Sequence, residues 1–216
     1  MTDLSKVFVE LTQTDAQISR EINKAISKEV NSIVKNRASR VERRFKSVIP
    51  TWVFETPEMQ SLLQEGVPNS LSAQFGLPAG TGAGVVDQIG FAIAQSISFD
   101  VQKVPSSAAK GGVTFNFQPS SFGNLITLSA GTVRTSRGQV LPWLEWLLSQ
   151  GTKTIIYGYQ YEPGDAGRSF GGTMIGGNIW RVPPEFAGTQ NNNFLTRMFA
   201  EREKEIASIL EGLFNV

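Results

Sequence analysis

Carboxylates are the side chains in this sequence with the widest choice of chemistry, because the chain contains no histidine and no cysteine. A Cys nucleophile, a Ser-His-Asp triad, an imidazole base and a zinc site of thiolates or imidazoles are therefore excluded. Acid–base catalysis or an oxygen-ligand metal site would require acids that converge. The candidate acids are instead dispersed singly, at Asp87, Asp100, Glu145, Glu162, Asp165 and Glu185. We expect no catalytic residue, no metal site and no cofactor, and hence no enzyme.

Glu145 is the strongest single candidate among these acids, since Trp143 and Trp146 flank it. The simpler interpretation is a helical residue that faces outward between two core tryptophans. A glycan-binding module is a different hypothesis, because Tyr157, Tyr159 and Tyr161 alternate and would share one face of a strand. Ordinary cross-strand packing of aromatic rings explains the same alternation.

Composition limits the class of protein further. The chain has 216 residues, 40% of them hydrophobic, and a formal net charge of +1. One sizeable core is possible, and the whole molecule is not a basic protein that seeks polyanions. No stretch approaches the roughly 18 apolar residues of a membrane span, and the first residues lack a signal-peptide pattern. We expect a protein that stays in a cytoplasm or in a particle assembled there, without a membrane partner.

A long amphipathic helix is the first element that the sequence predicts. Apolar residues recur at spacings of three, four and seven between residues 15 and 45, and Pro50 is expected to end the helix. Its polar face is mainly basic. The simpler interpretation is a solvated surface, and the alternative is a strip that meets DNA or an acidic partner. In that alternative Arg40, Arg43 and Arg44 face a DNA channel and make sparse contacts that do not depend on sequence.

Two short helices and a glycine-rich connection follow. Thr56 is a predicted cap with Pro57 in the first turn, and a second helix is expected to begin at Ser70 and to stop at Gly76. The next segment contains the glycines Gly80, Gly82 and Gly84. It lacks the order of residues and the lysine of a phosphate-binding loop, so it predicts a flexible connection.

The middle of the chain is expected to form a sheet. A period of two predicts strands at residues 93–101, 113–117 and 125–128, paired as an antiparallel meander, and a further pair at 155–161 and 173–182. A short helix opened by Pro142 is inserted at residues 142–150. The loop between the last two strands is long for a hairpin tip, so we expect it to be mobile or to be ordered by a partner subunit.

A final helix completes the predicted fold. Asn192 or Asn193 is expected to cap it, and it runs to about Leu213. We expect a single α+β domain over residues 1–216, with an antiparallel sheet packed against the long N-terminal helix and the C-terminal helix, and short helices in the connections. Its expected parts are the long helix at 1–50, the short helices and glycine-rich connection at 51–88, the sheet at 89–187 and the C-terminal helix at 188–216.

Three passages of the chain carry a family resemblance. The first is Thr56-Pro57-Glu58-Met59-Gln60-Ser61-Leu62-Leu63, followed by Phe75-Gly76-Leu77-Pro78. The second is the stretch from Leu144 to Gly151-Thr152, and the third runs from Ile179 to Asn191-Asn192-Asn193-Phe194-Leu195-Thr196-Arg197. In this order they resemble the neck and tail-completion proteins of long-tailed bacteriophages. The second passage is longer here than its usual form in that family.

The resemblance implies a structural virion protein at the head–tail junction. Such a subunit forms a homo-oligomeric ring, of six or twelve copies, between portal-side and tail-side virion proteins, with possible non-specific contact with passing DNA. Assembly in the host cytoplasm and residence in the virion are implied too. A tail terminator or head-closure subunit is the alternative within this class.

The subunit and partner contacts of such a ring are expected on three segments. Pro183 and Pro184 remove two backbone donors and fix an extended exit from the last strand, which suits docking. In a closed ring, each copy contacts the next through unlike surfaces. Such contacts would explain why the chain has a long helix and two extended loops. The expected interface residues are Gly80, Gly82, Gly84, Asp165, Arg168, Phe170, Trp180, Arg181, Pro183, Pro184 and Phe186.

Overall fold

The computed structural model describes residues 13–105, 107, 111–119, 121–135 and 138–213. Residues 1–12 of the predicted N-terminal part and 214–216 of the predicted C-terminal part lie outside these ranges. The chain divides into two compact units. The first contains the described residues up to Arg40 and the segment Phe99–Thr114, and the second contains Val41–Ser98 and the described residues from Phe115 onward. The fold is mixed α+β, as the sequence predicts.

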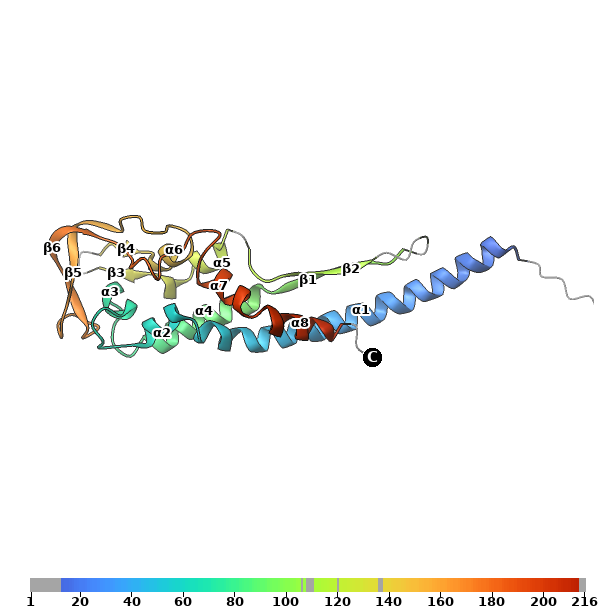
Figure 1. Cartoon of the computed structure of the whole chain (residues 1–216), viewed down its shortest axis with the longest axis horizontal. Helices are drawn as coiled ribbons and strands as arrows, with labels where there is room; N and C mark the ends of the chain where they lie inside the picture. Colours follow the sequence, from blue (N-terminus) through green and yellow to red (C-terminus); the bar gives the residue numbers. More distant parts are fainter. Residues whose placement is uncertain (1–12, 106, 108–110, 120, 136–137, 214–216) are drawn as a thin grey trace, which may run out of the picture. The chain divides into compact units, whose positions relative to one another are not determined.

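Eight α-helices and one 3₁₀ helix occur in the described ranges (Figure 1). They are α1 (Asp15–Phe54), α2 (Pro57–Leu63), α3 (Leu71–Phe75), α4 (Gly82–Ser96), α5 (Gly123–Ile126), η1 (Ser129–Gly131), α6 (Trp143–Leu148), α7 (Phe194–Glu201) and α8 (Glu203–Glu211). The strands are β1 (Ser98–Gln102), β2 (Gly112–Asn116), β3 (Val133–Arg134), β4 (Val140–Leu141), β5 (Ile156–Pro163) and β6 (Gly172–Trp180). They form three two-stranded sheets, β1–β2, β3–β4 and β5–β6.

In the first unit the segment after β1 is tied to α1 by side chains of the helix. The Ser27 hydroxyl donates to the Pro105 carbonyl at 3.2 Å. The Asn31 amide donates to the Val104 carbonyl at 3.1 Å and accepts from the Val104 N–H at 2.8 Å. The Asn31 amide thus pairs with both the N–H and the carbonyl of Val104, as a neighbouring strand would. These bonds fix the segment on one face of α1.

The second unit contains the main hydrophobic core, to which the later part of α1 contributes. Phe45, Ile49 and Val53 are fully buried there together with Ile89 and Ile93 of α4. Apolar burial of this kind is the main driving force of folding, at roughly 25 cal/mol per Å² removed from water. This core holds together elements that are short and would be marginal alone.

Aromatic and close helix contacts complete this core. Phe75, the last residue of α3, stacks on Trp143 of α6 with ring centroids 4.9 Å apart. Gly131 lies so close to α6 that a Cβ there would be 2.9 Å from the Leu144 Cβ. The short helices therefore pack at distances that only particular residue sizes allow.

Pro50 does not end the first helix, contrary to the sequence prediction. The helix α1 continues through it to Phe54, although a proline inside a helix removes one backbone hydrogen bond. Burial explains the continuation, because the last turn places Trp52 and Val53 in the core. Gly90 of α4 packs against the Pro50 ring, since a Cβ at Gly90 would lie 3.5 Å from the Pro50 Cβ.

The predicted single meander is also wrong. Residue 93 lies in α4, whose buried positions Val86, Ile89 and Ile93 recur at helical spacing, and the predicted strand at 125–128 contains α5 instead. Only the later part of the first predicted strand, in β1, and the second, in β2, form extended structure. The hairpin of β5 and β6 is confirmed as antiparallel, with Ile156 opposite Trp180. The three-stranded meander is absent because residues of its expected third strand form the helix α5.

The C-terminal helix is divided at Arg202 into α7 and α8. Its predicted start is confirmed, since Asn193 is the N-cap of α7. At the break the Arg202 guanidinium pairs with Glu55 and with Glu205 and lies 5.4 Å from the centre of the Trp52 ring. These contacts bind the junction of the two helices to the end of α1.

Candidate interaction surfaces

The glycine-rich segment before α4 is an ordered helix start rather than a flexible connection. The Glu65 carboxylate accepts from the Gly80 N–H at 2.6 Å and from the Gly82 N–H at 2.9 Å, one on each oxygen. Hydrogen bonds from Gly80 first, and then from Gly82, hold the pKa of Glu65 below its usual value. Gly82 is buried, and a Cβ there would lie 2.6 Å from the Leu62 carbonyl oxygen, whereas Gly80 and Gly84 are exposed.

The loop between β5 and β6 is hydrogen-bonded to other segments of its own chain. The Ala79 N–H donates to the Arg168 carbonyl at 3.2 Å, and the Gly66 N–H donates to the Ser169 carbonyl at 3.0 Å. Asp165, Arg168 and Phe170 are exposed on the outer side of this loop. The loop therefore presents a fixed shape to solvent.

The last residue of β6, Trp180, and the segment after it include both buried and exposed residues. Trp180 is buried, with its ring edge-on to Phe75 at a centroid distance of 5.7 Å. Arg181 and Pro184 are exposed, while Pro183 and Phe186 are half-buried. Of this expected interface, the outward-facing part is thus Arg181 and Pro184.

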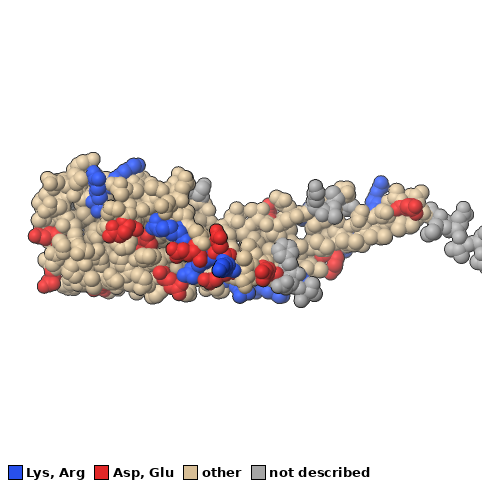
Figure 2. Space-filling model, viewed as in Figure 1, with Lys and Arg blue, Asp and Glu red and all other residues tan. Residues whose placement is uncertain are grey.

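The expected DNA-channel arginines are all exposed. Arg40 belongs to the first unit and Arg43 and Arg44 belong to the second. On the face drawn in Figure 2, basic and acidic side chains are mixed over α7 and α8 rather than separated by sign. Along α1, the basic residues between Arg20 and Lys46 are interrupted by Glu21, Glu29 and Glu42.

An apolar row on α1 lies outside the core. Ile22 and Ile26 are 53% and 54% exposed, and Ile33 is 38% exposed. The sequence placed them in one stripe with the buried residues, but the buried positions of this part of α1 are Ser27 and Ala38. Spacings of four and seven place the three isoleucines along one side of the helix. We call Ile22, Ile26 and Ile33 the isoleucine row.

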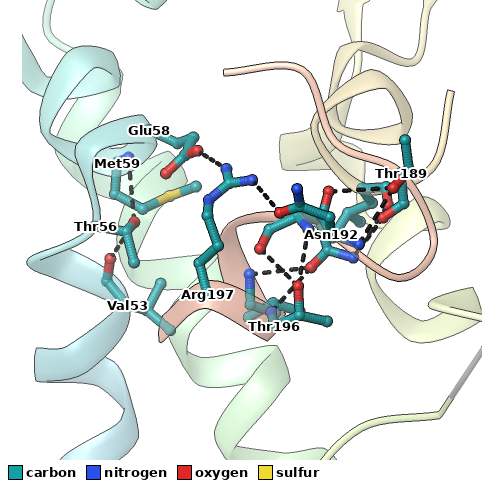
Figure 3. Close-up of polar contacts among 11 residues, drawn as sticks. Val53, Thr56, Glu58, Met59, Thr189, Asn192, Thr196 and Arg197 are labelled. Atoms are coloured by element: carbon teal, nitrogen blue, oxygen red, sulfur yellow. Dashed lines mark hydrogen bonds and ion pairs between the residues drawn. The ribbon is translucent and has the colours of Figure 1, made fainter. Parts of the chain in front are cut away.

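The start of α2 and the start of α7 meet at a buried ion pair (Figure 3). Glu58, in the first turn of α2, is 2% exposed and pairs with the Arg197 guanidinium of α7, which is 35% exposed. The Arg197 Nη1 also donates to the Asn192 Oδ1 at 2.9 Å. The arginine therefore bridges the start of α2 and the start of α7 across 139 residues of sequence.

The start of α7 is held by Asn193, which is fully buried. Its Oδ1 accepts from the Thr196 N–H at 3.1 Å, and the Thr196 hydroxyl accepts from the Asn193 N–H at 2.8 Å, which is a reciprocal capping box. The Asn193 Nδ2 donates to the Leu148 carbonyl at 3.2 Å and to the Thr189 carbonyl at 2.9 Å. One side chain thus caps α7 and joins it to the end of α6.

A groove of about 580 Å³ lies on the second unit, between α3, the small sheet β3–β4 and the hairpin β5–β6. Tyr157 and Tyr159 line it, and so does Arg168. Tyr161 does not, because its hydroxyl donates to the Gly171 carbonyl at 2.7 Å and accepts from the Asn69 N–H at 2.9 Å. The three alternating tyrosines of the sequence therefore divide into two groove residues and one structural residue.

The dispersed acids do not form a metal site within the described ranges, where no group of three or more Asp or Glu side chains converges. Glu145 is half-buried and accepts from the Gln150 Nε2 at 2.6 Å, while Trp143 is in the core and Trp146 is half-buried. None of the helices in these ranges combines the length and the apolar character that crossing a bilayer requires.

Comparison of the whole chain with models of protein families, with curated proteins and with solved structures finds no match.

Proposed function

We propose that this chain is a structural subunit of a tailed-bacteriophage virion that assembles into a ring at the head–tail junction. The observation that carries the proposal is the isoleucine row, three large apolar side chains in line on a helix and open to solvent. Such a row is costly to leave in water and is typical of a helix face that meets another protein. It supports a protein whose function is to bind copies of itself or neighbouring virion proteins.

Two further observations support a structural role. Two of the passages that resemble neck and tail-completion proteins meet at the Glu58–Arg197 ion pair. The exposed residues Asp165 and Phe170 lie on a loop whose backbone is hydrogen-bonded to other segments of the chain, so they offer a preformed surface. Preformed surfaces lower the entropic cost of assembly.

In this proposal the ring closes through heterologous contacts, in which the isoleucine row of one copy meets a different surface of the next. Six or twelve copies would place portal-side proteins on one face of the ring and tail-side proteins on the other. Arg40, Arg43 and Arg44 would contribute a weakly binding lining for passing DNA, since tight phosphate contacts would resist DNA movement.

The experiment is a measurement of native mass by light scattering, with negative-stain microscopy, on the protein alone and after mixing with portal complexes and with tails of the phage under study. The test variant is Ile22→Gln/Ile26→Gln/Ile33→Gln, and the matched control is Phe91→Gln, which changes an exposed aromatic residue of α4 in the second unit.

We expect rings, formed alone or on portal complexes, that the triple variant loses and the control keeps. A wild-type protein that stays monomeric and binds neither particle would overturn the proposal. Binding to tails alone would instead support the tail-terminator alternative, and binding to portal complexes alone would support the head-closure alternative.

A further inference from the structure

We propose that the groove between α3, β3–β4 and β5–β6 binds a saccharide that carries a carboxylate. Its volume of about 580 Å³ is within the range of ligand sites, roughly 300–1,000 Å³. The elements that line it come together at one end of the second unit (Figure 1). This inference is independent of ring assembly, because it uses none of the residues of the isoleucine row.

The charge of the groove favours an anion. Among the described residues that line it, Arg168 is the single charged one, so the lining offers a guanidinium and no carboxylate. Arginine is suited to this task, since its planar fork of donors matches a carboxylate. A carboxylate from a ligand would supply the missing counter-charge.

The chain holds Arg168 in place before any ligand arrives. The Arg168 Nη2 donates to the Arg134 carbonyl at 2.9 Å, while its own carbonyl accepts from the Ala79 N–H at 3.2 Å. The guanidinium also lies beside Gly76, where a Cβ would be 3.5 Å from the Arg168 Nε. In the part of the chain that the structure describes, the guanidinium makes this one hydrogen bond, and its other donors can meet a second acceptor.

The aromatic side chains favour a sugar ring. Tyr157 is 78% exposed. Leaving an aromatic ring in water is unfavourable in free energy, so packing within its own sheet does not explain its position. The hairpin is irregular here, because the register shifts between Tyr157 and Tyr159 around Gly158, whose φ is +77°. Such an irregularity changes the local course of the strand, and Tyr157 and Tyr159, on either side of it, both line the groove.

Polar, uncharged groups complete the lining. Gln139 and Thr135 come from one wall and Thr173 from the other. Amide and hydroxyl groups can donate to and accept from sugar hydroxyls, and exposed aromatic faces can cover the C–H face of a pyranose ring. Together with Arg168, these groups match an acidic saccharide.

The test uses isothermal titration calorimetry with two probes, trigalacturonic acid and 3′-sialyllactose, each compared with its methyl ester. The ester keeps the sugar rings and removes the negative charge. The variants are Tyr157→Ala and Arg168→Gln, and the control is Ile179→Ala, an exposed residue opposite Tyr157 that does not line the groove.

We expect at least one acid to bind, and to bind about tenfold more tightly than its ester, as one charge-assisted hydrogen bond predicts. Each groove variant should weaken binding by about tenfold, and Ile179→Ala should leave it unchanged. The affinity should also fall with added salt. Circular dichroism spectra of the variants must match the wild type, since these side chains are exposed.

Three results would each overturn the inference: no binding of either acid, equal binding of acid and ester, or binding that survives both groove variants. Native mass measured on the same variants separates this test from the assembly proposal, because Tyr157→Ala and Arg168→Gln leave the isoleucine row intact.

Discussion

Removing Arg197 should destabilise the second unit far more than neutralising Glu58, although both changes break the same ion pair. In Arg197→Met the Glu58 carboxylate stays 2% exposed and loses its cation. Its Oε2 already has no hydrogen-bond partner among the described residues. Removing one partner of a buried ion pair typically costs about 3–5 kcal/mol. Because the Arg197 side chain is 35% exposed, water can reach its side of the pair, and we expect a cost of about 3 kcal/mol.

The opposite change should be mild. In Glu58→Gln the amide keeps the size of the carboxylate, and the Arg197 guanidinium, 35% exposed, can turn to solvent and keep its bond to Asn192. We expect a cost of about 1 kcal/mol, the usual value for one intramolecular hydrogen bond. In the double variant the Gln should relieve much of the cost of Arg197→Met, because no buried charge is left unpaired.

The assay is urea unfolding at 25 °C followed by tryptophan fluorescence. All four tryptophans, Trp52, Trp143, Trp146 and Trp180, belong to the second unit, so the signal reports this unit alone. The control is Lys46→Met, which removes the partially exposed pair with Glu42 on α1 and should cost at most about 1 kcal/mol. Equal costs for Arg197→Met and Glu58→Gln, or additive costs in the double variant, would refute the reasoning.

Three other changes test the packing and electrostatics of the second unit. Asn193→Ala should lower the free energy of unfolding by about 2–3 kcal/mol, through the lost cap and the buried Leu148 carbonyl that loses its Asn193 donor, and Asn193→Asp, which keeps the cap acceptor but buries a carboxylate oxygen against the Leu148 and Thr189 carbonyls, should cost at least as much in the same urea assay. Glu65→Gln should be less stable than wild type at pH 7, and the difference should shrink as the pH falls below 4.5, because a lowered folded-state pKa gives stability that is lost on protonation; a constant difference from pH 7 to pH 3 would contradict this. Gly131→Val should cost about 1–3 kcal/mol in thermal unfolding, because its Cβ would be 2.9 Å from that of Leu144, and an unchanged melting temperature would show that α6 can move away.

Local signals in the sequence were enough to predict several element boundaries. Thr56 accepts from the Met59 N–H at the start of α2, and Gly76 adopts the left-handed conformation after α3, as their residue types indicate. These boundaries depend on hydrogen bonds within three or four residues, so the sequence contains all the participants. The same holds for the Asn193 cap.

Predictions failed where distant residues decided the outcome. Pro50 stays inside a helix because core contacts made by the last turn of α1 outweigh the lost bond, and the sequence does not show that core. The connection at Gly80 was expected to be flexible because its anchor, Glu65, lies 15 residues earlier. Ile93 was placed in a strand because glycines upstream hid the helical period of α4.

The candidate sites also combine features visible in the local sequence with features that depend on distant residues. The alternation of Tyr157 and Tyr159 was visible in the sequence, but the groove also needs Gly76 and Arg168, which the fold brings from another helix and from the hairpin loop. The isoleucine row was visible as a stripe, yet its exposure follows from which side of α1 the β1–β2 segment covers. Composition and spacing identify side chains, and only the fold decides which of them meet water.

Every strand in the described ranges belongs to a two-stranded sheet, so each has one side without a neighbouring strand. Unpaired strand edges are templates for aggregation. Of the described strands β5 and β6 are the longest, but the register shift beside Gly158 and Pro163, the last residue of β5, shorten any continuous edge. These irregularities should keep concentrated protein soluble, and replacing Gly158 by valine should lower the concentration at which thioflavin-positive aggregates appear.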